Sequence, residues 1–266
     1  MLASTLFFQV FAAVLVAGIP TSSERLAQRV ARRSAGTHQS QPMQVVAPDA
    51  AVSGASDVDY TANWSGAVVY TTTDAPWLSV TGQFTVPTPH EPTNGTGRHS
   101  VSAWVGIDGS GCDKILQTGV DFTVNGDTVT YTPWYEWYPA SEQDWTGFPI
   151  KAGDVITATV VATSATSGTA TLINESSGQR MSHTFSGQPA LCQYSAEWVV
   201  EDFTSGGKYV PLANFGTVTF TNLGAETADS TVGPAGARVI DIRQNGTVYT
   251  SASVTSDSVT VKYVGP

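Results

Sequence analysis

Charged residues are scarce in this sequence: only 13% of its 266 residues are Asp, Glu, Lys or Arg. A typical soluble domain is about one quarter charged. Lys and Arg together number 12 against 22 Asp and Glu, which leaves a net charge of −10 at neutral pH. Because nucleic-acid binding needs clustered cations, the composition argues against nucleic acid as a partner.

The common catalytic motifs are also absent. None of the four His belongs to an H-E-x-x-H pair, and there is no G-x-S-x-G, Asp-Thr-Gly or Asp-Ser-Gly. No motif therefore supports zincin, α/β-hydrolase or pepsin-like chemistry. Carboxylate chemistry remains, and a carboxyl group with an ordinary pKa near 4.3 is a useful base only in an acidic medium. We expect no metal and no cofactor.

Long apolar runs are missing except at the N-terminus, where residues 2–19 are almost wholly apolar. We interpret residues 1–20 as a cleaved secretory signal peptide, although a membrane anchor is the competing interpretation. The prediction is a secreted, extracellular protein that has no membrane association after signal cleavage.

A basic segment follows this run. Residues 21–55 contain four Arg against two acidic residues, whereas the chain from residue 51 onward carries 8 Lys or Arg and 20 Asp or Glu. We predict a propeptide at 21–55 and a folded domain at 56–266, so the protein would be made as a zymogen and its own propeptide would be a partner. A basic disordered linker is the alternative. Residues 25–34 are the best helical candidate in the chain.

From residue 60 onward, short β-prone segments alternate with Gly, Pro, Asn and Asp, which is typical of an all-β protein. The pattern predicts an antiparallel β-sandwich or barrel. The expected strands are Trp64–Tyr70, Trp77–Val86, Ser100–Ile107, Lys114–Phe122, Thr128–Tyr138, Asp154–Thr163, Gly168–Asn174, Tyr194–Glu201, Gly216–Thr221, Arg238–Arg243 and Ser258–Tyr263.

Several of these strands have an unusual second face. Side chains alternate between the two faces of a strand. In 100–108, one face is Val, Ala, Val and Ile, while the other holds Ser102, Trp104, Gly106 and Asp108. In the other strands the aromatic, acidic and amide residues of this kind are Gln117, Asp121, Trp134, Glu136, Glu197 and Glu201. Aromatics mixed with acids favour a groove for a polymer over simple capping of the sheet edges.

Export also affects the cysteines and glycosylation sites. Cys112 and Cys192 are expected to form a disulfide in an oxidising compartment, with two buried thiols as the alternative. Four Asn-x-Ser/Thr sequons begin at Asn63, Asn94, Asn174 and Asn245 and permit N-glycosylation in a eukaryotic host.

Five motifs together resemble the glutamic peptidases, also called eqolisins, in the same order along the chain. They are Asn63-Trp64-Ser65-Gly66, Trp104-Val105-Gly106-Ile107-Asp108-Gly109, Leu116-Gln117-Thr118-Gly119, Trp134-Tyr135-Glu136-Trp137-Tyr138-Pro139 and Ala196-Glu197-Trp198-Val199-Val200-Glu201-Asp202. The resemblance implies two curved antiparallel sheets of the concanavalin-like jelly-roll type. It also implies a catalytic pair, Gln117 and Glu197, and a cleft lined by Trp64, Trp104, Asp108, Trp134 and Glu201.

The implied activity is that of an acid endopeptidase that is insensitive to pepstatin. Ionised Glu197 would take a proton from an attacking water, and the Gln117 amide would stabilise the oxyanion. Polypeptides would be the substrates, and we expect a monomer. Two departures from the family pattern are Thr132, where other members carry Asp, and Ser65, where they carry Gly.

The alternative is a glycoside hydrolase or carbohydrate-binding module on the same sandwich. Two carboxyl groups beside Trp also suit sugar cleavage, and Glu136, Glu197 and Glu201 offer such pairs. Gln117 separates the hypotheses, because only the peptidase needs it.

Overall fold

The computed structural model describes residues 38–46, 58–72 and 74–266, all within one compact unit, Gly36–Pro266. The predicted signal peptide, the helix at 25–34 and the boundary at residues 55 and 56 lie outside the described residues. Of the predicted propeptide, the structure describes His38 to Val46. Every regular element in the described part is a strand, and it contains no helix long and apolar enough to cross a membrane.

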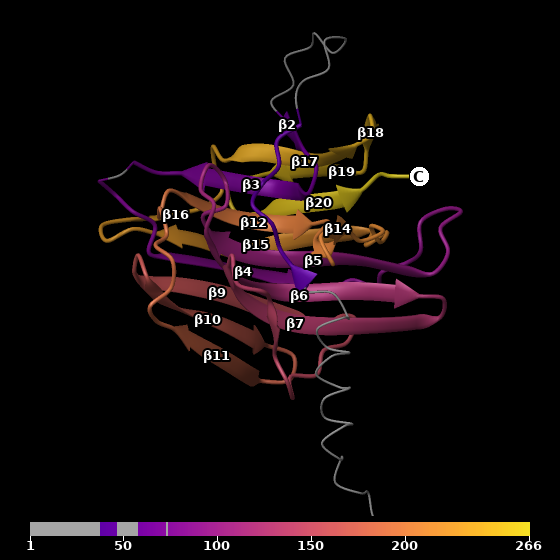
Figure 1. Cartoon of the computed structure of the whole chain (residues 1–266), viewed down its shortest axis with the longest axis horizontal. Helices are drawn as coiled ribbons and strands as arrows, with labels where there is room; N and C mark the ends of the chain where they lie inside the picture. Colours follow the sequence, from indigo (N-terminus) through magenta and orange to yellow (C-terminus); the bar gives the residue numbers. More distant parts are fainter. Residues whose placement is uncertain (1–37, 47–57, 73) are drawn as a thin grey trace, which may run out of the picture. The chain divides into compact units, whose positions relative to one another are not determined.

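The larger sheet has nine strands and carries all of the motifs noted in the sequence (Figure 1). All of its pairings are antiparallel except the pairing of β2 with β17. In spatial order its strands are β18 (Thr247–Val248), β17 (Arg238–Gln244), β3 (Trp64–Tyr70), β12 (Ser195–Glu201), β5 (Arg98–Ile107), β6 (Ile115–Asn125), β7 (Thr128–Tyr138) and β8 (Gln143–Asp144), with β2 (Val58–Thr61) beside β17.

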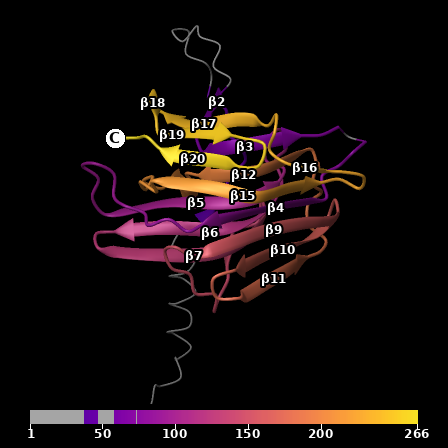
Figure 2. The ribbon, with the colours of Figure 1, turned by 180° about the vertical axis from the view of Figure 1, so that it is seen from behind.

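The second sheet has eight strands, which Figure 2 shows from behind. Their order is β11 (Gln179–Phe185), β10 (Ser167–Asn174), β9 (Val155–Ser164), β4 (Ser79–Thr85), β15 (Thr217–Glu226), β20 (Val259–Tyr263) and β19 (Thr250–Val254), with β16 (Thr231–Val232) beside β15. A small third sheet joins β1 (His38–Gln39), β13 (Thr204–Ser205) and β14 (Lys208–Tyr209).

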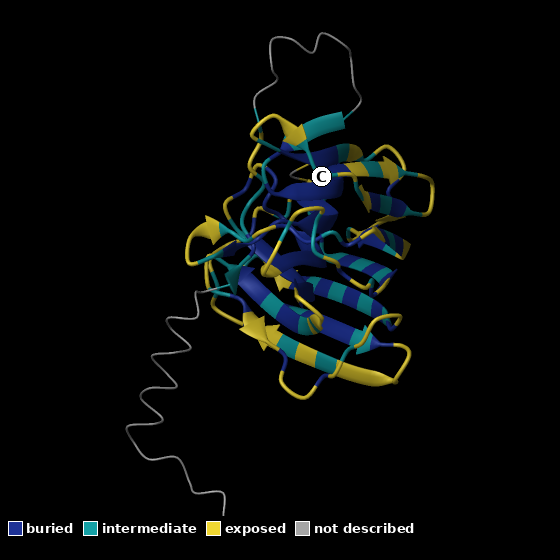
Figure 3. Cartoon of the chain, turned by 90° about the vertical axis from the view of Figure 1, so that its right-hand side faces the viewer, coloured by how far each residue is buried: buried dark blue, intermediate teal, exposed yellow. Residues whose placement is uncertain are grey.

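The main hydrophobic core lies between the two large sheets. Phe84 of the smaller sheet meets Phe122 of the larger one with ring centroids 6.3 Å apart. Trp198 of β12 donates its indole N–H to the Thr81 carbonyl, 2.8 Å away across the same interface. The open, two-sheet arrangement confirms the predicted all-β sandwich. Burial also alternates along many strands, as the striped colours of Figure 3 show.

Each of the eleven predicted strands corresponds to a strand in the structure, and 64–70 and 128–138 match residue for residue. Two strands of five or more residues were missed, β11 and β19. β11 is an edge strand with a polar sequence, and β19 is built mainly from small polar residues. Neither has the apolar alternation that identifies a strand in a sequence.

Candidate active site

The outer face of the nine-stranded sheet carries a second apolar cluster, separate from the core. Its buried members are Trp64, Val68, Trp104, Ile115, Trp134, Val199 and Ile240. The side-chain alternation expected from the sequence is confirmed here: Trp104 and Val199 belong to this cluster, whereas Val105 and Trp198 belong to the core. Polar groups set among these aromatics form the candidate site.

One row of residues crosses four neighbouring strands on this face. Glu197 of β12 is paired with Gly106 of β5, Gly106 with Gln117 of β6, and Gln117 with Glu136 of β7. Residues paired in this way lie on the same face of a sheet. The register therefore brings together the two residues predicted to be catalytic, with one glycine between them.

Gly106 separates Glu197 from Gln117 without placing a side chain between them. Adjacent strands lie about 4.8 Å apart, so the two backbones that carry the pair are roughly 10 Å apart. A Cβ at Gly106 would lie 3.3 Å from Glu197 Oε1, 3.3 Å from Gln117 Cβ and 2.8 Å from the Trp104 ring. Only glycine therefore fits between the two side chains, because any larger residue would collide with the Trp104 ring.

Gln117 is held in place by Glu136. Its Nε2 donates to Glu136 Oε2 at 2.7 Å, and its Oε1 makes no hydrogen bond within the described residues. Both side chains are buried. Burial raises the pKa of Glu136 well above its usual value, and the nearby Glu142 and Glu201 raise it further. The amide is therefore fixed on one side and free on the other.

Glu197 is fully buried, and neither of its carboxyl oxygens is hydrogen-bonded within the described part of the chain. Burial raises its pKa well above the usual value, and the charge of Asp108 adds to that shift. Buried polar atoms without partners are rare in proteins. Two such oxygens on one carboxyl group are suited to bind water or a polar ligand group.

Glu201 links two of the predicted cleft tryptophans. Its Oε2 accepts the indole N–H of Trp104 at 2.9 Å, and the Trp104 and Trp64 rings meet edge to face at 4.9 Å. Burial raises the pKa of Glu201 to about 8. Trp134 donates its indole N–H to the Ser102 hydroxyl at 3.1 Å. These contacts make a rigid, largely aromatic wall beside the row.

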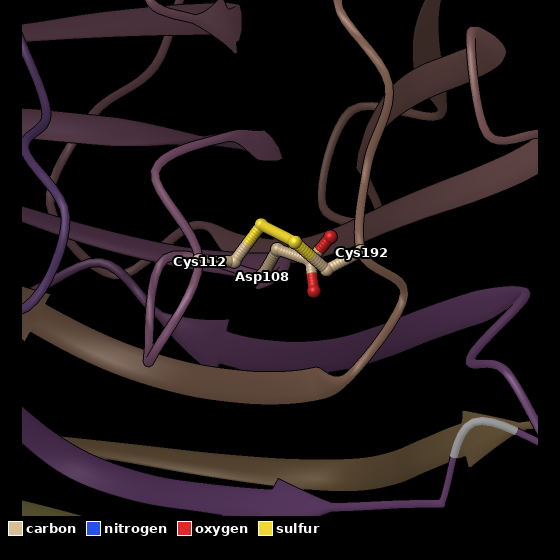
Figure 4. A group of neighbouring side chains, drawn as sticks. All are labelled: Asp108, Cys112 and Cys192. Carbon is tan, nitrogen blue, oxygen red and sulfur yellow. A yellow bond between two sulfur atoms is a disulfide. The ribbon is translucent and has the colours of Figure 1, made fainter.

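Asp108 has a different position from the other predicted cleft residues. It follows β5 with φ of 75°, and its carboxylate accepts the backbone N–H groups of Gln193 and Tyr194, each at 2.8 Å. It lies beside the disulfide between Cys112 and Cys192, which is present as expected (Figure 4). Asp108 thus fixes the chain that leads into β12. Disulfide sulfurs are not thiolates, so this group offers no metal site.

The segment His38–Val46 lies across the candidate site. Figure 1 shows it in indigo, passing over β12, β5 and β6. The Gln41 N–H donates to Glu201 Oε1, the Gln41 carbonyl accepts the Trp64 indole N–H, and Met43 packs on the apolar cluster. This cover explains why the predicted cleft residues are buried.

Asn63 also binds this segment. Its Oδ1 accepts the Gln44 N–H at 2.9 Å, and its Nδ2 donates to the carbonyls of Gln41 and Pro42. Asn63 and Asn174 are fully buried, so neither fits a glycosylation site, while the sequon residues Asn94 and Asn245 are exposed.

Sequence reasoning found most of this face but missed the connections. Gly106, Asp121 and Glu136 were placed on the correct face, yet nothing in the pattern singled out Gly106 as the residue between the pair or Glu136 as the partner of Gln117. The cross-strand register supplies both relationships. Glu142 gave no signal, because it lies in the turn after β7.

This architecture is that of a glutamic peptidase. The solved structure of scytalido-glutamic peptidase with a transition state analog inhibitor superimposes with a TM-score of 0.69 at 36% identity, covering 76% of this chain and 98% of that one. The sequence model of the Peptidase A4 family matches residues 62–263, so the chain belongs to that family.

Two relatives agree with this assignment. The chain is 43% identical to aspergillopepsin-2 of Aspergillus niger over 92% of its own length and 93% of that protein. It is 37% identical to scytalidopepsin B of Scytalidium lignicola over 91% of its own length and 90% of that protein. The chain is therefore a peptidase, and polypeptides are its substrates.

Proposed function

We propose that this peptidase is a secreted acid endopeptidase in which Glu197 is the general base and Gln117 stabilises the oxyanion. The observation that carries the proposal is the row itself, in which Gly106 has Glu197 with two unpaired oxygens on one side and the Gln117 amide on the other. A water between the two side chains would contact both at once.

The proposed reaction needs only these two side chains. Ionised Glu197 takes a proton from the water, and the resulting hydroxide attacks the carbonyl carbon of the scissile peptide bond. The second N–H of the Gln117 amide donates to the oxygen on which negative charge develops. Protonated Glu197 then gives its proton to the leaving amine. Glu136 holds the first amide N–H, so it is a positioning residue for Gln117.

Two features support acidic conditions. An amide does not titrate, so the oxyanion donor keeps its hydrogen bonds at low pH, where a histidine would change its charge. Removal of the overlying segment would hydrate this face, which opposes the effect of burial and lowers the pKa of Glu197.

The remaining parts of the proposal concern maturation. Residues 1–20 are the signal, residues 21–55 are a propeptide removed on activation, and the mature enzyme acts as an extracellular monomer. Support comes from the apolar N-terminus and the charge contrast in the sequence, and from the position of His38–Val46 over the site. A substrate strand needs the same surface, so the segment has to leave first.

A protein-digestion assay at about pH 3–4, with and without pepstatin, tests this proposal. We expect hydrolysis of denatured protein that pepstatin does not inhibit, because the sequence has no aspartic-dyad motif. The same chain carrying Glu197→Gln is the negative control. Full inhibition by pepstatin, or hydrolysis by the Glu197→Gln chain, would contradict the assignment.

A further inference from the structure

The segment His38–Val46 is held over the candidate site chiefly through its backbone. Gln41 makes a two-point contact: its N–H donates to Glu201 Oε1 at 2.9 Å and its carbonyl accepts the Trp64 indole N–H at 2.9 Å. Two residues further on, the Met43 N–H donates to the Gly109 carbonyl at 3.0 Å. Contacts of this kind suit an extended peptide of almost any sequence.

Ser40 reaches the catalytic row itself. It is fully buried beside Glu136, the residue that holds Gln117, and beside Glu201, and its proximity offsets part of the rise in the pKa of both carboxyl groups. The segment therefore covers the part of the row that positions Gln117.

His38 enters an acidic socket next to this row. Its Nδ1 lies 2.9 Å from Asp121 Oδ2 and 3.4 Å from Glu142 Oε1, and its ring packs on Phe203 at 4.4 Å between centroids. Asp121 and Glu142 are buried. Beyond the socket, Asp144 adds negative charge and Arg98 lines the small cavity that also contacts His38.

The carboxyl groups of Asp121 and Glu142 make the socket suited to a positively charged side chain. Two buried carboxyl groups close together are costly unless a cation compensates for them. Burial alone would lower the pKa of His38, but its contacts with Asp121 and Glu142 outweigh burial and raise the pKa to about 10. The imidazole is therefore positively charged in acidic and neutral solution. His38 is also the only ionisable side chain between residues 38 and 46.

We propose that the catalytic face is an interaction surface for the chain's own segment His38–Met43, and that His38 in the Asp121–Glu142 socket is its specific anchor. The inference rests on the proposed function, since it identifies the residues by which the predicted propeptide blocks the enzyme. The backbone contacts at Gln41 and Met43 hold a strand of any sequence, whereas the socket distinguishes this segment from others.

Hydrogen exchange of the full-length chain tests the anchor directly. The chain carries Glu197→Gln so that it cannot cleave itself, and exchange is followed at the Gln41 and Met43 amides. We expect His38→Ala to speed exchange at both amides by about tenfold or more, and Asp121→Asn to have a similar effect. His38→Lys, which keeps the positive charge, should restore protection to within about threefold of the parent chain.

An exposed histidine supplies the matched control. His90 lies on the surface, so His90→Ala should leave exchange at both amides unchanged. Equal exchange in the His38→Ala and parent chains would overturn the proposal, because the segment would then be held without the socket. Slower exchange in His38→Ala would overturn it as well.

A second measurement uses the chain with Glu197 intact. Before any cleavage, verified by mass spectrometry of the intact chain, His38→Ala should turn over a peptide substrate at least about tenfold faster than the parent. Faster amide exchange in His38→Ala supports the anchor even if none of the chains cleaves the peptide substrate. Faster exchange without any cleavage would count only against the proposed function. If the intact His38→Ala chain is active but turns over the peptide no faster than the parent, the idea that the segment blocks the active site would be wrong.

Discussion

Gln117 donates its side-chain amide to Glu136 on the neighbouring strand, with 2.7 Å between Nε2 and Oε2. The two residues are directly paired across β6 and β7, and both are buried. This relationship fixes which way the Gln117 amide points. It leaves the amide oxygen without a hydrogen-bond partner among the described residues, and Glu136 uses only one of the two amide N–H groups.

Removing the amide should abolish most of the activity. We expect Gln117→Ala to lower kcat by about 10²–10³, the loss seen when one oxyanion donor is removed. Each variant has to be assayed after processing by another protease, because self-cleavage would fail as well. Circular dichroism and the melting temperature should show an intact fold.

The effect of replacing Glu136 on kcat should depend on the new side chain. In Glu136→Gln, the side-chain carbonyl can still accept the Gln117 N–H, so the loss in kcat should stay below about tenfold. Glu136→Ala frees the amide and should cost more. If Glu136→Gln is inactive while Gln117→Ala is fully active, the results would instead favour chemistry based on two carboxyl groups.

Glu197→Gln should be at least as damaging as Gln117→Ala, because it removes the base and keeps the shape. Its stability should not fall. The carboxyl group of Glu197 is fully buried and has no hydrogen-bond partner among the described residues, and a neutral amide costs less to bury than a charged carboxylate. Thermal unfolding of the full-length variant at pH 6, with the overlying segment still in place, measures this. A melting temperature well below that of the parent would indicate a structural role.

Gly106→Ala should damage the site by filling it. The added methyl group would approach the Trp104 ring to 2.8 Å and Glu197 Oε1 to 3.3 Å. We expect at least a tenfold loss in kcat/KM and a destabilisation of about 1–3 kcal/mol from overpacking. Gly224→Ala is the matched control, since a methyl group there makes only ordinary contacts at 3.5 Å. Equal activity of Gly106→Ala and the parent would show that this position is not used.

The sequence predicted the fold well because the strands that build the site have strong patterns. β5 and β12 each have an apolar face and a second face that carries polar residues, so Trp104 and Glu197 could be assigned to the outer face without a structure. The order of strands in the sheet was not predictable, because pairs such as β12 with β3 join residues more than a hundred positions apart.

The roles of individual polar residues were less accessible. Asp108 and Glu201 belong to the same kind of face by sequence pattern, and only the structure distinguishes their roles. Asp108 is bound by backbone N–H groups beside the disulfide, whereas Glu201 contacts the overlying segment. His38 had no pattern at all. Its socket combines Asp121 with Glu142 from a turn, and no local rule in a sequence connects such residues.

The disulfide should contribute substantially to stability. Cys112 and Cys192 are separated by 80 residues, and closing a loop of that length stabilises a fold by about 4–5 kcal/mol on the chain-entropy account. The double variant Cys112→Ser, Cys192→Ser should therefore melt at least about 8 °C lower. A thiol titration of the unfolded, unreduced parent should find no free thiols. Two free thiols, or an unchanged melting temperature, would contradict the expectation.

Stability should fall as the pH rises from about 4 to 8. Burial raises the pKa of several carboxyl groups: to about 8 for Glu142 and Glu201, to about 7 for Asp202 and to about 6 for Asp241. A carboxyl group whose pKa is higher in the folded state stabilises the fold below its ordinary pKa near 4. That contribution is lost as the pH rises through the folded value, because the charged form is costly to bury.

The size of the effect and its test follow from the same groups. A pKa raised by one pH unit is worth about 1.4 kcal/mol, and 1 kcal/mol moves the melting temperature of such a domain by about 2–4 °C. Even partial contributions should therefore lower the melting temperature by about 10 °C or more between pH 4 and pH 8.

The exposed pair of Asp59 and Arg238 acts in the opposite direction, because Arg238 lowers the pKa of Asp59, but exposed ion pairs contribute little. Unfolding curves of the full-length Glu197→Gln chain, which cannot digest itself, measure this at several pH values. Glu201→Gln, which cannot ionise, should flatten part of the slope, and a melting temperature that rises toward pH 8 would refute the account.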